Sequence, residues 1–122
     1  MGNRNETSVL IAGKSVRGAM VYNPAGESLG DIYDVMIDKD SGKIIYALMS
    51  LGGLLGIGRK LHPLPWSVLK YGPEIGGYVV TLSKSQLEAA PNYPVEFLPD
   101  FSDRDREAEL HRYYGVEPCW AA

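Results

Sequence analysis

The stretch Ile44–Ser67, IIYALMSLGGLLGIGRKLHPLPWS, decides the fold. Its first half, Ile44–Leu51, is apolar at almost every position, which is typical of a β-strand that is covered on both faces. With the preceding Lys43 it gives an expected strand at Lys43–Leu51. A glycine-rich segment follows, and then Leu61–Pro65, whose two prolines cannot donate hydrogen bonds to a sheet. The stretch therefore predicts a buried strand, a loop, and a short strand at an edge or end of the sheet.

Further strands are expected on both sides of this stretch. Arg17–Tyr22 and Leu29–Asp38 are separated by the turn sequence Asn23–Glu27, and residues 38–42 form a second turn with glycine where positive φ is needed. Tyr78–Leu82 is expected as a fifth strand. The apolar face of the second strand is interrupted near its start, which indicates a β-bulge at or near Gly30.

The last third of the chain carries helix signals. Ser83–Gln86 has the capping-box pattern, and Pro91 stops the helix that it opens. Ser102–Asp105 opens a second helix, in which Leu110, Tyr113 and Tyr114 share one face, and Gly115 ends it. We expect this extension to pack on its own barrel or on a neighbouring copy.

These elements predict a mainly β fold: a small closed or partly open antiparallel β-barrel of SH3-like size, with a short helix and a C-terminal helical extension. We expect an N-terminal arm at residues 1–14, the barrel at 15–82 and the extension at 83–122. Trp66 is expected to be the largest side chain of the core. The other expected core residues are Val35, Ile37, Ile45 and Met49.

Composition narrows the functional classes. The net charge is −3, with eight basic and seven acidic residues in 1–82 but four basic and eight acidic residues in 83–122. No basic stripe is present, so direct nucleic-acid binding is not expected. The longest uncharged run, Ile44–Gly58, holds four glycines and is too short to span a membrane. A single cysteine, Cys119, fits a reducing compartment, so a cytoplasmic location is expected.

Two motifs come close to known ligand loops and miss them. Gly53–Gly58 has the glycine spacing of a phosphate-binding loop, but Arg59-Lys60 and a proline-containing strand follow where the motif requires a lysine, a hydroxyl residue and a helix. Asp38–Gly42 resembles the start of a calcium loop, but Lys43 stands where that loop requires glycine and Met49 stands where it requires a glutamate ligand. A connector and a turn are the simpler interpretations.

Side chains that could hold a metal are few. Asp31, Asp34 and Asp38 lie on one strand, where a solvated face is the simpler interpretation, and a pair formed by His111 and Cys119 would need two further ligands. No nucleophile, base or paired-acid arrangement is present. We therefore expect no catalytic residue, no metal and no cofactor, and the chain is not expected to be an enzyme.

One set of residues lies in a fixed order along the expected strands and turns: Val21-Tyr22, Gly26-Glu27, Leu29-Gly30, Ile32, Val35, Ile37-Asp38, Ser41-Gly42-Lys43, the loop Gly52–Gly58 and His62–Ser67. This set resembles a PRC-barrel domain, the small β-barrel named after the cytoplasmic part of the photosynthetic reaction-centre H subunit. The resemblance covers about residues 15–82, and the flanks Leu87–Tyr93 and Tyr113–Trp120 are similar to the extensions of stand-alone bacterial members. The family implies an adaptor or assembly surface and assigns no catalytic residues to the barrel.

The leading hypothesis is a non-enzymatic protein-interaction module that self-associates, with a two-fold dimer as the favoured assembly. The expected contact residues are Tyr46 and Leu48 on the buried strand and Leu54, Leu55 and Ile57 on the glycine-rich loop. One alternative is a small-ligand or metal-binding protein that uses the aspartate strand or the His/Cys pair. A second is a ribosome- or RNA-associated maturation adaptor, by analogy with another family member that binds a ribosomal protein.

Overall fold

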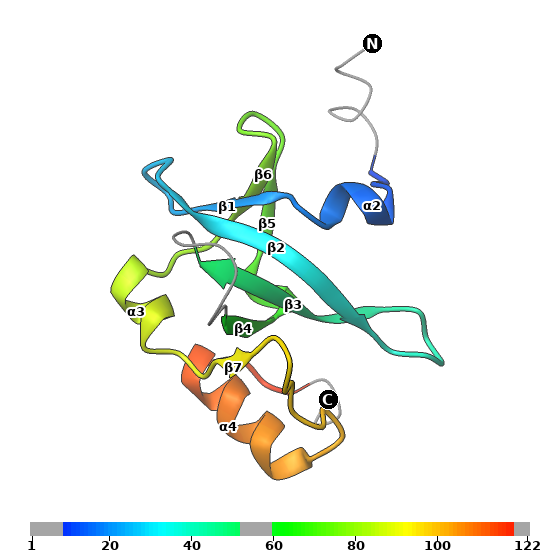
Figure 1. Ribbon diagram of the computed structural model, residues 1–122. Coiled ribbons are helices and arrows are strands. Elements are labelled where there is room, and N and C mark those ends of the chain that lie inside the picture. The colour runs from blue at the N-terminus through cyan, green and yellow to red at the C-terminus, as the bar shows by residue number, and fades with distance from the viewer. Residues whose placement is uncertain (1–8, 52–59, 119–122) are drawn as a thin grey trace.

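The computed structural model describes residues 9–51 and 60–118 (Figure 1). Seven strands in this part of the chain form one sheet in the order β5-β6-β1-β2-β3-β4-β7. The strands are β1 (Met20–Tyr22), β2 (Ser28–Ile37), β3 (Ile44–Leu51), β4 (Lys60–Pro65), β5 (Lys70–Gly72), β6 (Gly77–Val79) and β7 (Tyr93–Pro94). The helices are α2 (Gly13–Val16), the 3-10 turn η1 (Trp66–Val68), α3 (Lys84–Glu88) and α4 (Arg104–Tyr114).

The sheet curls but hydrogen bonds do not close it, so β5 and β7 remain its two edges among the described strands. All neighbouring strands are antiparallel except β1 and β6, which pair in parallel. The expected mainly β, partly open barrel with a C-terminal helix is thus confirmed. Strands β5 and β7 were not expected, because each is short and contains proline or is followed by it.

The turns and caps follow from local sequence. In the β1–β2 turn Gly26 has φ +87°, and in the β2–β3 turn Gly42 has φ +77°. Ser83 and Gln86 form the expected capping box at α3. The Asp103 side chain caps α4 by accepting hydrogen bonds from the backbone amides of Asp105 and Arg106. Gly115 ends that helix in the left-handed conformation.

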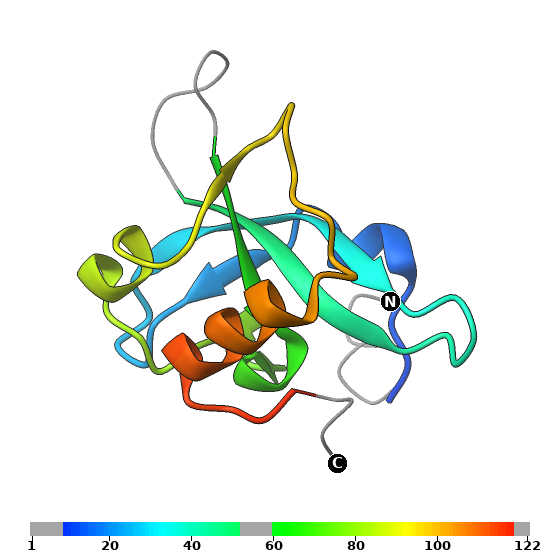
Figure 2. The same ribbon diagram turned by 90° about the horizontal axis from the view of Figure 1, so that it is seen from below.

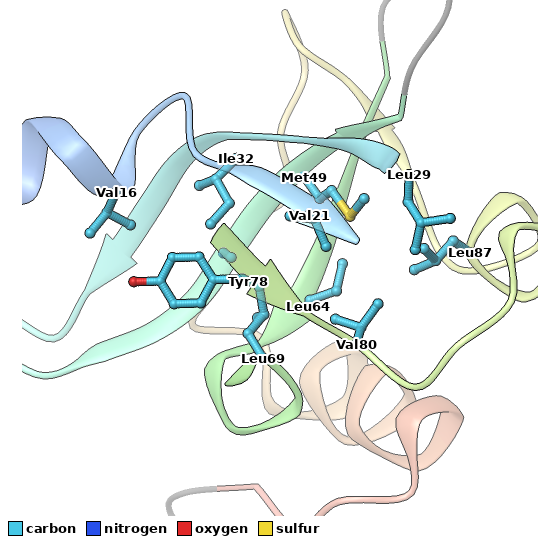
Figure 3. Close-up of a cluster of buried hydrophobic side chains, with 11 residues drawn as sticks. Val16, Val21, Leu29, Ile32, Met49, Leu64, Leu69, Tyr78, Val80 and Leu87 are labelled. Atoms are coloured by element: carbon cyan, nitrogen blue, oxygen red, sulfur yellow. The ribbon is translucent and has the colours of Figure 1, made fainter. Parts of the chain in front are cut away.

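Strand β3 is covered on both faces, as its sequence predicts. On one face Ala47 and Met49 join the main hydrophobic core, whose side chains come from α2, η1, α3 and the strands β1, β2, β3, β4 and β6 and point toward one another (Figure 3). On the other face Tyr46 and Leu48 lie opposite Pro65 and Pro63 of β4. Helix α4 covers this second face (Figures 1 and 2).

Strand β4 is not an edge strand, because β7 pairs with it on the side away from β3. However, β7 pairs only with Lys60 and Leu61. Pro63 and Pro65 lie beyond this short ladder, where β4 has no strand partner on that side among the described residues. The position of the two prolines therefore agrees with the rule that proline avoids fully paired strands.

The expected core residues are found at different depths. Met49 is completely buried, whereas Val35, Ile45 and Trp66 are partly buried. Ile37 is 55% exposed, because it is the last residue of β2, next to the turn, and it does not contribute to the core. The largest fully buried side chain is Tyr46, not Trp66, because Trp66 follows the end of β4 and lies at the rim.

Candidate interaction surface

A groove of about 490 Å³ lies beside the edge strand β5 and is lined mainly by apolar and aromatic side chains. Trp66 comes from η1, Tyr71 from β5 and Tyr78 from β6, and the first described residues run along its side. We call this feature the aromatic groove. Its lining residues are Val9, Leu10, Ile11, Trp66, Leu69, Lys70, Tyr71 and Tyr78.

The floor of the aromatic groove is a cluster of three aromatic rings, those of Trp66, Tyr71 and Tyr78. The ring of Tyr78 makes edge-to-face contacts with Trp66 and with Tyr71, each with centroids 5.3 Å apart. Such contacts stabilise aromatic pairs beyond the area that they bury. Burial raises the pKa of the Tyr78 hydroxyl, and the neighbouring Tyr71 adds to this, so the phenol stays neutral over the physiological pH range. The floor of the groove is therefore aromatic and uncharged.

The side of the groove is apolar and open to solvent. Val9 is 97% exposed and Leu10 is 78% exposed, and Ile11 and Tyr71 are also exposed. Contiguous apolar surface of this kind is rarely left in water and often marks a contact with another molecule. Lys70 is the only charged side chain among the described residues that line the groove.

A buried polar network fixes α4 against β3 on another face of the molecule. The Tyr46 hydroxyl donates to Glu107 Oε1 at 2.8 Å, and His111 Nε2 lies 2.9 Å from the same hydroxyl oxygen. Which group donates in this second bond depends on the tautomer of His111. Glu107 and His111 are one turn apart on the helix, so both face the sheet.

Burial sets the protonation of this network. Desolvation raises the pKa of the Glu107 carboxyl, while the hydrogen bond from Tyr46 and the charge of Arg104 oppose the rise. Desolvation also lowers the pKa of His111, while a backbone hydrogen bond to Glu117 opposes the fall. Both shifts favour the neutral form of the group that is removed from water.

A second cleft, of about 550 Å³, lies between the β2–β3 turn and the start of α4. We call it the helix cleft. Ile45, Phe101 and Tyr46 give it apolar and aromatic walls, and the buried Glu107 is among its lining residues. The rest of the lining is Met36, Ile37, Asp38, Ser41, Lys43, Ser102 and Arg104.

The contact residues expected from the sequence are not assembled by the described structure into one surface. Leu54, Leu55 and Ile57 lie outside the described residues. Tyr46 and Leu48 are buried, because α4 of the same chain covers their face of β3. A contact of these two side chains with another polypeptide would require α4 to move.

The candidate metal ligands do not converge. Asp34 faces Arg17 with an N–O distance of 3.6 Å, and Asp38 accepts a hydrogen bond from the Ser41 amide in the turn. This bond and the Ser41 hydroxyl lower the pKa of Asp38. Across residues 9–51 and 60–118, no three His, Cys, Asp or Glu side chains gather in a way that could hold a metal ion. Cys119 lies outside the described residues.

His62 does not approach His111. It pairs with Met49 in the β3–β4 ladder and so lies on the main-core face of the sheet, whereas His111 lies on the α4 side. His62 is buried, and desolvation lowers its pKa, with the charge of Glu88 opposing the fall. Its position is that of a residue packed inside the barrel.

Sequence reasoning missed the aromatic groove and the Tyr46 network. Trp66, Tyr71 and Tyr78 are spread over three elements, and no spacing rule connects them before the β5–β6 hairpin is known. Glu107, Leu110 and His111 have the i, i+3, i+4 spacing of one buried helix face. This spacing is the signal that could have indicated a buried helix face. A glutamate and a histidine at two of its three positions are instead typical of a face that is exposed to solvent.

The fold and the groove together define a small β module with an apolar groove beside its edge strand β5. The family model for the PRC-barrel domain matches residues 9–87, and the chain belongs to this family. The match begins at the apolar residues beside the aromatic groove and ends in α3. A search of curated proteins found no match. No helix in the part of the chain that the structure describes is long and apolar enough to cross a membrane.

Proposed function

We propose that the chain is a non-enzymatic protein-interaction module of the cytoplasm that associates with further copies of itself. The observation that carries the proposal is the aromatic groove, with its cluster of three aromatic rings and the exposed Val9 and Leu10. Large aromatic side chains in preformed pockets are the typical anchors of protein interfaces. Rigid rings also lose little conformational entropy when a partner binds.

The arrangement of ionisable groups supports a binding role over catalysis. The buried groups with shifted pKa near a cleft, Glu107 and His111, both bond to Tyr46 and hold α4 in place. A catalytic acid or base must instead reach the reacting atoms of a substrate. Among the described residues that line the groove, Lys70 is the only one with acid–base or nucleophilic chemistry at neutral pH.

Sedimentation velocity of the full chain over a wide concentration range tests the proposal. We expect the weight-average mass to rise with concentration, and the Leu10→Glu variant to stay closer to the monomer mass because the charge would have to be buried in the contact. A wild-type mass that remains at 13.4 kDa at every concentration would contradict self-association.

The glycine-rich loop needs a separate variant. Replacing both Leu54 and Leu55 by aspartate should weaken the assembly if the loop takes part in the contact, and leave it unchanged if the loop is only a connector. Pull-downs with the wild type and with this variant, read side by side, would also report any different partner that binds through the loop.

Small-ligand binding is a second candidate function, and the helix cleft favours it. The cleft volume lies within the range of about 300–1,000 Å³ that is usual for small-molecule sites. Oε1 of Glu107 accepts a hydrogen bond from Tyr46, and Glu107 is one of the residues that line the cleft. Native mass spectrometry of the purified chain would reveal a retained small molecule, and Glu107→Gln should lower its occupancy. Absence of any added mass would count against this function.

A further inference from the structure

A second apolar feature lies on the connector between β7 and α4. Phe97 is 76% exposed, and the neighbouring Leu98 is also exposed. The amide of Phe97 donates to the carbonyl of Pro94 at 3.0 Å, which closes a turn that presents the ring. We call residues 96–100 the connector tip. This turn leaves Phe97 and Leu98 open to solvent at the tip.

Acidic residues flank the connector tip. Glu96 and Asp100 are both exposed on either side of Phe97 and Leu98. The hydroxyl and amide of Ser102 bond to Asp100 and lower the pKa of its carboxyl, so Asp100 is ionised under physiological conditions. The tip thus combines an apolar centre with negative neighbours.

The aromatic groove has the complementary character. Its walls are apolar and aromatic, and Lys70 supplies the only charge among the described lining residues. An apolar knob flanked by carboxylates fits an apolar groove flanked by an ammonium group, because the charges steer and orient the contact while the rings fill the groove.

Groove and tip lie on different sides of one molecule. Figure 2 shows the connector between β7 and α4 at one edge, while η1 and the first described residues lie toward the opposite edge. Figure 1 also separates the connector from α2 and the chain segment before it. One chain therefore cannot place its own tip in its own groove, but a second copy can supply the tip.

We propose that copies of this chain associate head to tail, with the connector tip of one copy seated in the aromatic groove of the next. The proposal rests on self-association as the proposed function and gives that association a geometry. It replaces the two-fold dimer expected from the sequence. A heterologous contact of this kind forms a ring when its rotation closes and an open chain when it does not.

A complementation experiment by sedimentation velocity tests the geometry. Phe97→Glu removes the tip and keeps the groove, and Tyr71→Glu removes the groove and keeps the tip. Each variant alone should sediment as a monomer, whereas an equimolar mixture should form a complex of two chains and nothing larger. Leu10→Glu serves as a second groove variant if Tyr71→Glu unfolds, which circular dichroism would show.

Ile37→Glu is the matched control for association, because Ile37 is exposed like Phe97 and lines the helix cleft, not the aromatic groove or the connector tip. We expect this control to associate like the wild type. If the Phe97→Glu variant alone still associates like the wild type, or if the mixture stays monomeric, the head-to-tail contact is wrong while self-association stands. A wild type that is monomeric at every concentration would overturn both proposals.

Discussion

Tyr46 shows how one hydroxyl connects the barrel to its extension. It reaches Glu107 and His111, which are 61 and 65 residues away in sequence, and its ring also lies 5.5 Å from that of Phe101. Each of these partners belongs to the C-terminal extension. The position of α4 on β3 therefore depends on a polar contact inside an apolar interface, where an unpaired group is costly.

Replacing Tyr46 by phenylalanine should destabilise the protein. The change keeps the ring but leaves the buried Glu107 and His111 without their shared partner, which costs about 1–3 kcal/mol. Urea denaturation measures the free energy of unfolding. Tyr71→Phe is the control, since the Tyr71 ring is exposed, and it should stay within about 0.5 kcal/mol of the wild type. Equal stability of both variants would refute the role of the hydroxyl.

The Glu107 carboxyl should make the stability depend on pH. Its pKa is raised in the folded state above the ordinary value of 4.5 for a glutamate, chiefly by desolvation, so folding favours the protonated form. The stability that this preference contributes is fully present below the unfolded-state pKa and is lost as the pH rises through the folded-state pKa. Ionisation of Glu107 therefore weakens the folded state.

Glu107→Gln should remove this dependence, because the amide does not ionise. We expect the unfolding free energy of the variant, relative to the wild type, to increase from about pH 4 to about pH 8. Any loss from altered hydrogen bonding is the same at every pH, so the slope is the measurement that matters. Urea denaturation at several pH values that gives two parallel curves would disprove the raised pKa.

At the scale of elements, strand β2 depends on Gly30. A Cβ placed on Gly30 would lie 2.1 Å from the backbone oxygen of Ser50 on β3, which is far inside van der Waals contact. The ladder between β1 and β2 also shifts register here, since Val21 pairs with Gly30 and Tyr22 with Ser28. The bulge expected at or near Gly30 is confirmed by this register shift.

Gly30→Ala should force β2 and β3 apart locally. Because the clash is with backbone atoms, we expect the free energy of unfolding to fall by at least about 1–3 kcal/mol, the usual cost of overpacking. Gly13→Ala is the matched control, because a Cβ at Gly13 meets nothing within 4 Å. Thermal unfolding compares the two variants, and a Gly30→Ala midpoint no lower than that of the control would be inconsistent with the close strand approach.

The elements also show how far sequence alone reaches. The two apolar faces of β3, the glycine turns and the caps at Ser83 and Asp103 are local signals, and each predicted its element. The contact between the rings of Tyr71 and Tyr78 is not a local signal, because it depends on the pairing of β5 with β6. The burial of Glu107 was equally hidden, since its cost is offset by Tyr46 from a distant strand.

In the molecule as a whole, the C-terminal extension covers β3 and β4 at one side of the sheet, whereas the apolar surface beside β5 is open to solvent. The extension covers β3 and β4, so the surface expected there is already occupied by the chain itself. The open region is the aromatic groove, at the other end of the strand order beside β5. An assembly contact is therefore expected at β5 and η1.

Hydrogen–deuterium exchange of the full chain, compared between dilute and concentrated solution, tests this account most directly. If the aromatic groove is the recognition surface, amides in residues 66–72 and 9–11 should gain protection as the concentration rises, while exchange in α3 stays the same. Gained protection confined to other parts of the chain, or none in 66–72 under conditions where the mass has risen, would contradict the claim.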